Sequence, residues 1–259
     1  MNQALTNIHP EAKIGKDVII EPFVTITKDV VIGDGTWVGP TAVIMDGARI
    51  GSNCKIFPGA QISGIPQDLK YEGEITTTEI GNNTSVREFV TINKGTNAKG
   101  KTVVGENCLL QSYSHIAHDS ILKNNVILGA YSGVAGEVEV DDFAIISAGS
   151  LVHQFVRIGK HVMIQGASKV SKDVPPYIMA GRDPLSFAGL NSVGLRRRGF
   201  SNDVIDVIQE IYRNVYNRGL NTSDAIAFIN ENIEQSAERE EVVNFIKSSK
   251  RGIIRGMQS

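Results

Sequence analysis

The sequence contains little that would place the protein outside a reducing compartment or within a membrane. Only Cys54 and Cys108 are present among 259 residues, too few for a disulfide framework or a four-thiolate zinc site. No uninterrupted apolar run approaches the ~20 residues that span a bilayer, and the N-terminus lacks a basic start followed by an apolar run. We therefore expect a cytoplasmic protein without stable membrane insertion.

A strong charge of one sign is also absent. The 26 Lys and Arg residues nearly balance the 28 Asp and Glu residues, giving a formal net charge of −2. This balance produces no overall attraction to nucleic acid, so we expect no nucleic acid partner. Any charged partner must instead bind a local patch. Hydrophobic residues make up 41% of the chain, which is enough to bury a core.

The sequence does contain a repeat of six residues. From Ile8 to Val170, 25 of the 28 positions at this spacing are Ile, Val or Leu; the exceptions are Asp68, Glu74 and Ala98. The position two residues before each aliphatic forms a second column that is small or β-branched. A period of six fits neither a helix, which repeats every 3.6 residues, nor a flat strand, which repeats every two. It is typical of a parallel β-helix, in which short strands alternate with tight turns.

Two segments interrupt this repeat. SGIPQDLKYEGEITTTE places Asp68 and Glu74 at core positions, and NKGTNAKGKT is polar and rich in glycine and lysine. An unpaired carboxylate is costly in an apolar interior. We therefore expect both segments to leave the solenoid as loops, after which the repeat resumes in register.

The repeat ends at Pro175 and Pro176, which cannot donate to a strand ladder and are interpreted as a stop. We predict a β-helix domain over residues 1–180 and a helical domain over residues 181–259, which can cover the open end of the solenoid. Ser201 can cap a helix that ends near Gly219, and a last amphipathic segment covers about 238–250. Between them, a helix can be capped by Thr222 or Ser223.

Four histidines lie outside both core columns, so we do not expect them to fill the core: His115, His118, His153 and His161. Each could simply be solvated. Zinc binding is disfavoured, because two histidines three residues apart on a strand would not both face one ion. General base catalysis needs only one imidazole, whose pKa is ordinarily near ~6.5, and Asp119 beside His118 could fix its tautomer. Cys54 and Cys108 lie in the column of small residues, so we expect them to pack in the core.

Seven motifs, in this order and spacing, resemble those of the UDP-N-acetylglucosamine acyltransferase family: PQDLKY, HIAHD, VDDFAII, VHQF, HVM, DVPPY and LRRRGF. The resemblance covers nearly the whole chain. It implies an all-β fold, a left-handed parallel β-helix of hexapeptide repeats, with a C-terminal α-helical domain. It also implies three hexads per coil, hence about nine coils for 28 hexads, and a homotrimer.

The resemblance further implies an activity in lipid A biosynthesis. A 3-hydroxyacyl chain would pass from acyl carrier protein to the 3-position of UDP-N-acetylglucosamine or its 3-amino analogue, with no covalent intermediate, cofactor or metal. His118 would be the general base, Asp119 its orienting partner, and Gly136 the backbone donor to the developing oxyanion. The residues that would bind substrate are Gln67, Asp68, Lys70, His115, Glu137, His153, Gln154, Asn191, Arg197 and Arg198, and those that would limit acyl length are Gln165 and Gly166.

Glu137 departs from the family pattern, because better-known members have histidine after the glycine of this motif. A carboxylate facing the oxyanion would oppose it, whereas a carboxylate could pair with a 3-amino group. The sequence leaves two questions open: whether the acceptor atom is the 3-hydroxyl oxygen or a 3-amino nitrogen, and whether Glu137 simply faces solvent. Basic residues that we expect to bind the acidic carrier protein are Lys169, Lys172, Arg196, Lys247, Lys250 and Arg251.

Other functions remain alternatives at this stage. A non-catalytic β-helical scaffold would carry its histidines incidentally, and a hexapeptide-family zinc enzyme of the carbonic anhydrase type would use them as ligands. The later N-acyltransferase of the same pathway carries an additional N-terminal uridine-binding domain. Because the hexads begin at Ile8, we expect no such domain in this chain.

Overall fold

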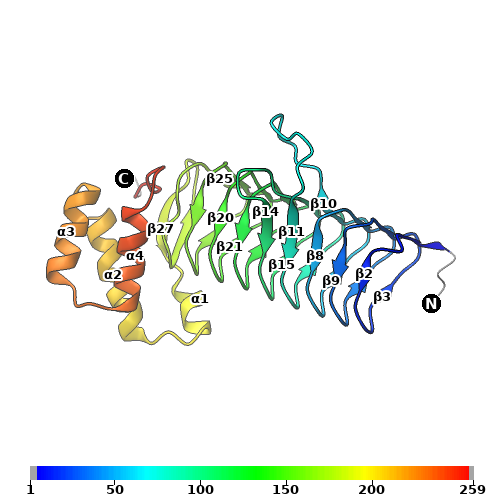
Figure 1. The fold of residues 1–259 in the computed structure, drawn as a ribbon. Coiled ribbons are helices and arrows are strands. Elements are labelled where there is room, and N and C mark those ends of the chain that lie inside the picture. Colours follow the sequence, from blue (N-terminus) through cyan, green and yellow to red (C-terminus); the bar gives the residue numbers. More distant parts are fainter. Residues whose placement is uncertain (1–4, 257–259) are drawn as a thin grey trace.

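The computed structural model describes residues 5–256, which form an elongated three-sided prism followed by a group of helices (Figure 1). Each coil of the prism contributes one short strand to each of three parallel sheets, here named A, B and C. The fold class predicted from the repeat, a parallel β-helix with a C-terminal helical part, is confirmed.

Each sheet stacks strands from successive coils. Sheet A contains β1 (Asn7–Ile8), β4 (Thr25–Ile26), β7 (Val43–Ile44), β10 (Gln61–Gly64), β13 (Thr91–Asn93), β16 (His115–Ile116), β19 (Gly133–Val134), β22 (Leu151–Val152) and β25 (Lys169–Val170). Sheet B contains β2 (Lys13–Ile14), β5 (Val31–Ile32), β8 (Ala48–Ile50), β11 (Thr77–Ile80), β14 (Lys101–Val104), β17 (Ile121–Leu122), β20 (Glu139–Val140) and β23 (Arg157–Ile158). Sheet C contains β3 (Ile19–Ile20), β6 (Trp37–Val38), β9 (Lys55–Ile56), β12 (Ser85–Val86), β15 (Leu109–Leu110), β18 (Ile127–Leu128), β21 (Ile145–Ile146), β24 (Met163–Ile164), β26 (Ile178–Gly181) and β27 (Ser186–Leu190).

The two sequence columns fill the interior of the prism. The aliphatic column points inward from the strands, and from Ile26 onward its strand members are at most 3% exposed. The small column lines the corners, where Cys54 and Cys108 are buried as predicted. Tight corners need a residue with positive φ, which asparagine tolerates, as at Asn107 and Asn125. The period of six therefore records one inward aliphatic and one sharp turn for each strand.

The corners form three long edges that position the site described below. We name them by the sheets they join. In one coil the AB edge is residues 117–120, the BC edge 123–126 and the CA edge 129–132. Residues one coil apart stack along the same edge.

Both predicted loops are present. Residues 65–76 project from the prism between β10 and β11, and residues 94–100 join β13 to β14 (Figure 1). The strands resume in register after each loop, because Ile80 pairs with Ile50 and Val104 pairs with Ile80. The loops also contain the three hexad positions that are not aliphatic. Strands β1 to β25 therefore make eight coils and one additional strand, slightly fewer than the nine coils predicted.

The prediction that Pro175 and Pro176 stop the strand ladder was wrong. β26 continues sheet C by pairing with β24, and β27 returns antiparallel to β26. The two prolines precede β26 and lie in the connection to it, where no ladder hydrogen bond is required of them. The division of the chain at residue 180 stays a prediction.

Four helices follow: α1 (Ser192–Arg197), α2 (Asn202–Tyr216), α3 (Thr222–Asn232) and α4 (Ala237–Lys247). Ser201 caps α2 as predicted, by accepting a hydrogen bond from the Val204 N–H. The cap of α3 is Asn221 and neither of the predicted residues. Helix α1 was not predicted, because six residues are too few for an apolar periodicity to show. No helix in residues 5–256 is both long and apolar enough to cross a membrane.

Candidate active site

A cavity of about 430 Å³ lies where sheet A meets the AB edge. The residues that line it are Gln67, His115, Ala117, His118, Gly133, Val134, Ala135, Gly136, Leu151, Val152 and Gln154. Five of these are predicted site residues, contributed by the first loop and by three successive coils. The fold thus brings together side chains that are distant in the sequence.

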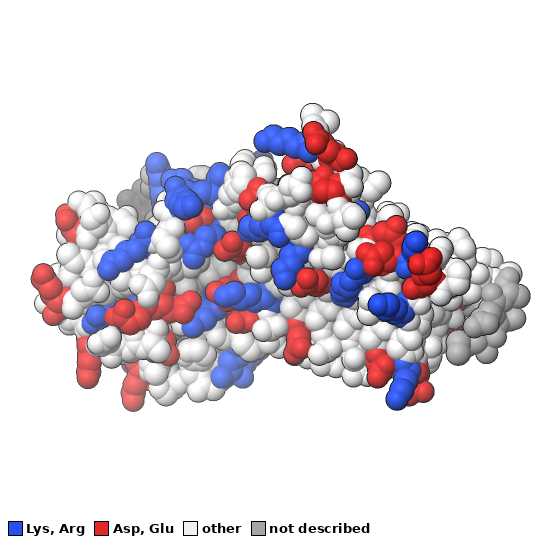
Figure 2. All heavy atoms as spheres, in the orientation of Figure 1, with Lys and Arg blue, Asp and Glu red and all other residues white. Residues whose placement is uncertain are grey.

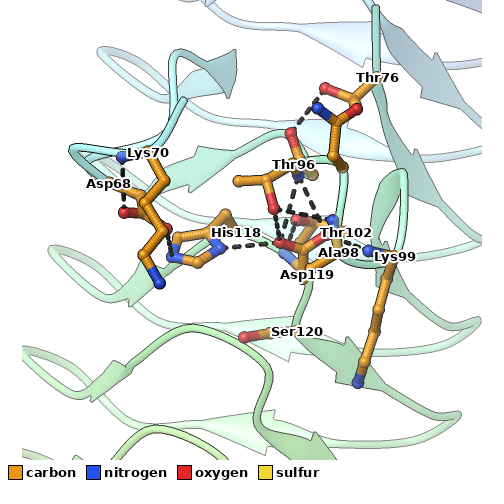
Figure 3. Close-up of polar contacts among 12 residues, drawn as sticks. Asp68, Lys70, Thr76, Thr96, Ala98, Lys99, Thr102, His118, Asp119 and Ser120 are labelled. Atoms are coloured by element: carbon orange, nitrogen blue, oxygen red, sulfur yellow. Dashed lines mark hydrogen bonds and ion pairs between the residues drawn. The ribbon is translucent and has the colours of Figure 1, made fainter. Parts of the chain in front are cut away.

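His118 and Asp119 form the buried centre of this site (Figure 3). The His118 side chain is 11% exposed, and its Nδ1 lies 2.8 Å from Oδ2 of the fully buried Asp119. Because an ionised carboxylate can only accept, Nδ1 is the ring nitrogen that donates to Asp119, and in the neutral ring Nε2 is the one with a lone pair. The geometry therefore leaves Nε2 as a proton acceptor.

Asp119 is itself held by the second loop. Its carboxylate accepts hydrogen bonds from Thr96 Oγ1 at 2.6 Å, from the Thr96 N–H and from the Lys99 N–H. Burial alone would raise the pKa of Asp119, but the bonds from Thr96, His118 and Lys99 outweigh it and lower the pKa from its usual 3.8. Asp119 therefore stays ionised. Sequence reasoning missed Thr96 and Lys99, because no local pattern connects a loop to a residue in another coil.

The first loop supplies a second carboxylate. Asp68 Oδ2 lies 3.8 Å from Nε2 of His118, and Asp68 Oδ1 accepts the Lys70 N–H. Asp68 and Lys70 lie on the Nε2 side of the ring and Asp119 on the Nδ1 side (Figure 3). This arrangement explains why a core position of the repeat carries a carboxylate: the residue has left the core to reach the site.

Gly136 occupies the position one coil after His118 on the AB edge. A Cβ built on Gly136 would lie 2.6 Å from Nε2 of His118, closer than real Cβ contacts, so the ring requires a glycine there. The Gly136 N–H makes no hydrogen bond within residues 5–256. It is a free backbone donor beside a proton acceptor.

Two further histidines lie near this site: His115 lines the cavity, and His153 lies on the AB edge after β22. His115 Nδ1 lies 2.7 Å from Thr91 Oγ1, and burial lowers the pKa of His115 below its usual 6.5, so the ring is neutral at neutral pH. His153 is exposed, and its Nδ1 lies 3.1 Å from the carbonyl oxygen of Gln154, which it can only approach as a donor. Glu137 is half-buried, and its carboxylate makes no hydrogen bond or ion pair within residues 5–256.

The remaining predicted residues lie on the other two edges of the chain. Asn191 Nδ2 donates to the His161 carbonyl at 2.9 Å, and the Arg198 guanidinium lies over the Phe143 ring, 5.1 Å from its centroid. These contacts place the segment with Asn191, Arg197 and Arg198 at the BC edge. The turn that contains Gln165 and Gly166 follows β24 and belongs to the CA edge. One chain therefore does not gather all of the predicted residues around His118.

The expectation that His161 does not fill the interior was wrong. Its side chain is 7% exposed and stacks between Phe143 and Tyr177, with ring centroids 4.9 and 5.8 Å apart. Burial, helped by the nearby cations Arg198 and Lys160, lowers the pKa of His161 to about 4. Lying outside the aliphatic columns did not exclude burial, because β27 and the first helix cover this end of the BC edge. In residues 5–256 no group of three or more His, Cys, Asp and Glu side chains has a metal-binding arrangement.

Comparisons with known proteins give concordant results. Residues 173–254 match the family model described as Udp N-acetylglucosamine O-acyltransferase, Domain 2, and residues 29–64 and 101–136 match the bacterial transferase hexapeptide model. An acyl-(acyl-carrier-protein)–UDP-N-acetylglucosamine O-acyltransferase from Burkholderia orbicola is 40% identical over 199 residues, covering 75% of this chain and 76% of the relative. A protein of the same name from Nautilia profundicola is 41% identical over 189 residues, covering 73% of each chain.

Solved structures agree over nearly the full length. The UDP-N-acetylglucosamine acyltransferase from Bacteroides fragilis superposes with a TM-score of 0.97 at 54% identity, covering 98% of this chain and 100% of that one. The corresponding enzyme from Francisella novicida superposes with a TM-score of 0.94 at 40% identity, covering 97% and 93% of the two chains. The similarity therefore includes the helical part as well as the β-helix.

Proposed function

The chain belongs to the UDP-N-acetylglucosamine acyltransferase family, and from this premise we propose that it transfers a 3-hydroxyacyl chain from acyl carrier protein to the 3-position of UDP-N-acetylglucosamine, a step of lipid A biosynthesis. The observation that carries the proposal is the buried His118–Asp119 pair, whose Nε2 makes no hydrogen bond within residues 5–256 and lies at a cavity beside the unpaired Gly136 N–H. A non-catalytic scaffold has no use for a buried ionised aspartate bonded to a histidine, since that arrangement costs burial energy.

The mechanism follows from which atoms are free. Nε2 of His118 accepts the proton of the acceptor group as that group attacks the thioester carbonyl carbon. The carbon–oxygen bond forms, and the Gly136 N–H donates to the oxyanion of the tetrahedral intermediate. The intermediate then expels the carrier thiolate, which takes the proton from Nε2. Asp119 remains ionised throughout and stabilises the imidazolium.

We propose that the first loop, residues 65–76, binds the acceptor sugar nucleotide. Asp68 can accept from a sugar hydroxyl beside Nε2, and the Lys70 side chain, on the same side of the ring, can approach the diphosphate. Gln67 and His115 line the same cavity and add neutral hydrogen-bonding groups. A general base needs its substrate within hydrogen-bond reach, and this loop supplies that positioning.

We propose a homotrimer in which each site lies between neighbouring chains. The support is the separation of the predicted residues: His118 is at the AB edge, whereas Arg197 is in the segment packed at the BC edge. The CA edge also carries a strip of exposed aromatic rings, Phe89, Tyr113 and Tyr131, stacked at 5.0 Å spacing. Exposed apolar strips of this kind are typical of surfaces buried between subunits.

The test of the proposed function is acyl transfer by the purified protein. Carrier proteins loaded with chains of several lengths are incubated with the 3-hydroxyl and the 3-amino sugar nucleotides, and products are identified by mass spectrometry. We expect an acylated sugar nucleotide, with a preference within about two carbons because each buried methylene contributes about 0.8 kcal/mol. Gln165 and Gly166 remain the residues proposed to set that length.

The matched control is His118→Ala. Removing a general base lowers the rate by about 10²- to 10⁴-fold. We expect this loss in His118→Ala with a melting temperature near that of the unmodified protein, since Asp119 keeps its hydrogen bonds from Thr96 and Lys99. If no donor gave a product, the proposed function would be contradicted. If His118→Ala were fully active, His118 would not be the general base.

A further inference from the structure

Glu74, like Asp68, is a carboxylate at a core position of the repeat, but it does not line the catalytic cavity. It is half-buried in the first loop. Its Oε1 accepts the Asn97 N–H of the second loop at 3.1 Å, and its Oε2 accepts the Glu72 N–H of its own loop at 2.8 Å. One carboxylate therefore joins the two loops that interrupt the β-helix.

The charge of Glu74 is directed at backbone donors. Desolvation alone would raise the pKa of Glu74, but hydrogen bonds from backbone N–H groups, including those of Glu72 and Asn97, outweigh it and lower the pKa from its usual 4.5. The carboxylate is therefore ionised at neutral pH. It forms no ion pair within residues 5–256, although the projecting loop carries basic as well as acidic side chains (Figure 2).

A second side chain joins the same two loops. Thr76 is buried, and its Oγ1 donates to the Gly95 carbonyl oxygen at 2.6 Å. Glu74 and Thr76 thus hold the two residues that flank Thr96 in the chain. Thr96 is the residue whose hydroxyl and N–H bind the Asp119 carboxylate (Figure 3). The first loop therefore fixes the backbone that presents Thr96 to the catalytic pair.

Tyr71 braces the first loop between Glu74 and the residues proposed to bind the acceptor. The Tyr71 N–H donates to the Asp68 carbonyl oxygen at 3.0 Å, and the Tyr71 hydroxyl donates to the Glu74 carbonyl oxygen at 3.2 Å. Nζ of Lys94, in the second loop, lies over the Tyr71 ring, 5.6 Å from its centroid. A continuous series of contacts therefore connects Asp68 with Glu74 and with the second loop.

We propose that Glu74 and Thr76 are positioning residues that couple acceptor binding to the orientation of the catalytic pair; this inference rests on the proposed function. An acceptor held by Asp68 and Lys70 restrains the first loop. The contacts between the loops pass that restraint to the segment that holds Asp119. Acceptor binding thereby orders the base that the acceptor needs, and a carboxylate at a core position of the repeat has a role outside the cavity.

The kinetic test compares Glu74→Ala with the matched control Glu72→Ala, which removes the same charge from the same loop. The Glu72 side chain forms no hydrogen bond or ion pair within residues 5–256. In Glu74→Ala we expect kcat to fall by about fivefold or more, while KM for UDP-N-acetylglucosamine stays within about twofold because Asp68 and Lys70 are unchanged. The control should match the unmodified protein.

A double-mutant cycle separates positioning from general loosening of the loop. In a Thr96→Val background, Glu74→Ala should lower kcat by less than about twofold further, because both changes act through Thr96. Thr76→Val should also lower kcat, whereas Thr76→Ser keeps the hydroxyl and should retain most of the activity. Effects of Glu74→Ala and Thr96→Val that multiply in full would show that Glu74 does not act through Thr96, contrary to the proposal.

Hydrogen–deuterium exchange measures the coupling without catalysis. In the unmodified protein, saturating UDP-N-acetylglucosamine should slow exchange in residues 65–76 and in residues 94–100. In Glu74→Ala/Thr76→Val it should slow exchange in residues 65–76 only. No added protection of residues 94–100 in the unmodified protein, equal protection there in the double variant, or an equal loss of kcat in Glu72→Ala would overturn the proposal. If the unmodified protein neither binds the sugar nucleotide nor transfers an acyl group, the proposed function fails, and this inference fails with it.

Discussion

Thr96 contacts Asp119 through both its hydroxyl and its backbone N–H, more contacts than His118 makes with that carboxylate. We therefore interpret Thr96 as a positioning residue that fixes Asp119 and, through it, the His118 ring. Hydrogen bonds to charged groups contribute about 1.5–3 kcal/mol. We expect Thr96→Val to lower kcat at least tenfold with little change in KM, and Thr96→Ser to retain most of the activity, measured in acyl-transfer assays. If Thr96→Ser were as impaired as Thr96→Val, the hydroxyl would not be the cause.

A second prediction about a single residue concerns Glu137 and the acceptor atom of the sugar. Glu137 has a positive φ of 60° in the turn that follows Gly136, and its carboxylate has no hydrogen-bond or ion-pair partner in the described residues. An amine on the sugar could pair with it, whereas a hydroxyl would engage it more weakly. On this hypothesis the 3-amino sugar nucleotide is used at least tenfold better than the 3-hydroxyl one, about 1.4 kcal/mol. Glu137→His should narrow the gap; equal kcat/KM values for the two acceptors would end the hypothesis without affecting acyl transfer itself.

The sequence predicted His118 because its partner is the next residue, so the pair could be read locally. Thr96 was not predicted, because it lies 23 residues from Asp119 and meets it only after the second loop folds back. The composition of that loop showed that it leaves the solenoid but not what it contacts. Residues that bind substrate can be matched by motif, whereas residues that hold those residues in place depend on the folded contacts.

At the scale of elements, the stack of rings at the BC edge makes stability depend on pH. The pKa of His161 is about 4 in the folded protein, against 6.5 for the free side chain, because the ring is buried and near cations. Between these values the unfolded chain binds a proton that the folded chain does not. We therefore expect the free energy of unfolding to fall by up to roughly 3 kcal/mol as the pH drops from about 6.5 to about 4.

The control for this prediction is His161→Phe. Phenylalanine can continue the stack with Phe143 and Tyr177, and Nδ1 of His161 has no hydrogen-bond partner to lose. Denaturant unfolding at several pH values should give a shallower decline for this variant than for the unmodified protein. Parallel declines would mean that other groups, such as the half-buried His115, dominate the acid sensitivity.

Elements were predictable where the repeat is regular. One aliphatic in every six residues specified the strands, and a carboxylate at a core position specified the first loop, because burial energy leaves little choice. The continuation past Pro175 was not predictable by the same logic, since a proline opposes a strand only where a ladder bond is needed. Helix α1 is short, and its position follows from the contact of Asn191 with the His161 carbonyl, not from its own sequence.

At the scale of the whole molecule, the sequence does not show on which edge of the prism each predicted residue lies. Motif order says nothing about this, because residues three hexads apart share an edge whereas residues one hexad apart lie on different edges. The structure assigns His118 to the AB edge and the Arg197 segment to the BC edge. A whole prism face separates them, so a ligand that needs both residues requires a second chain.

This separation leads to a prediction about mixed oligomers. His118→Ala and Arg197→Ala should each have low activity, the first by loss of the base and the second by loss of a cation that has no ion pair within residues 5–256. If each site combines His118 of one chain with Arg197 of its neighbour, co-expressed variants rebuild intact sites. With random assembly around a ring of heterologous interfaces, roughly a quarter of the sites are intact, so about a quarter of the activity should return. Separately purified variants mixed without subunit exchange are the control. Activity no greater than the sum of the two variants would place both residues in the site of one chain and contradict the shared-site trimer.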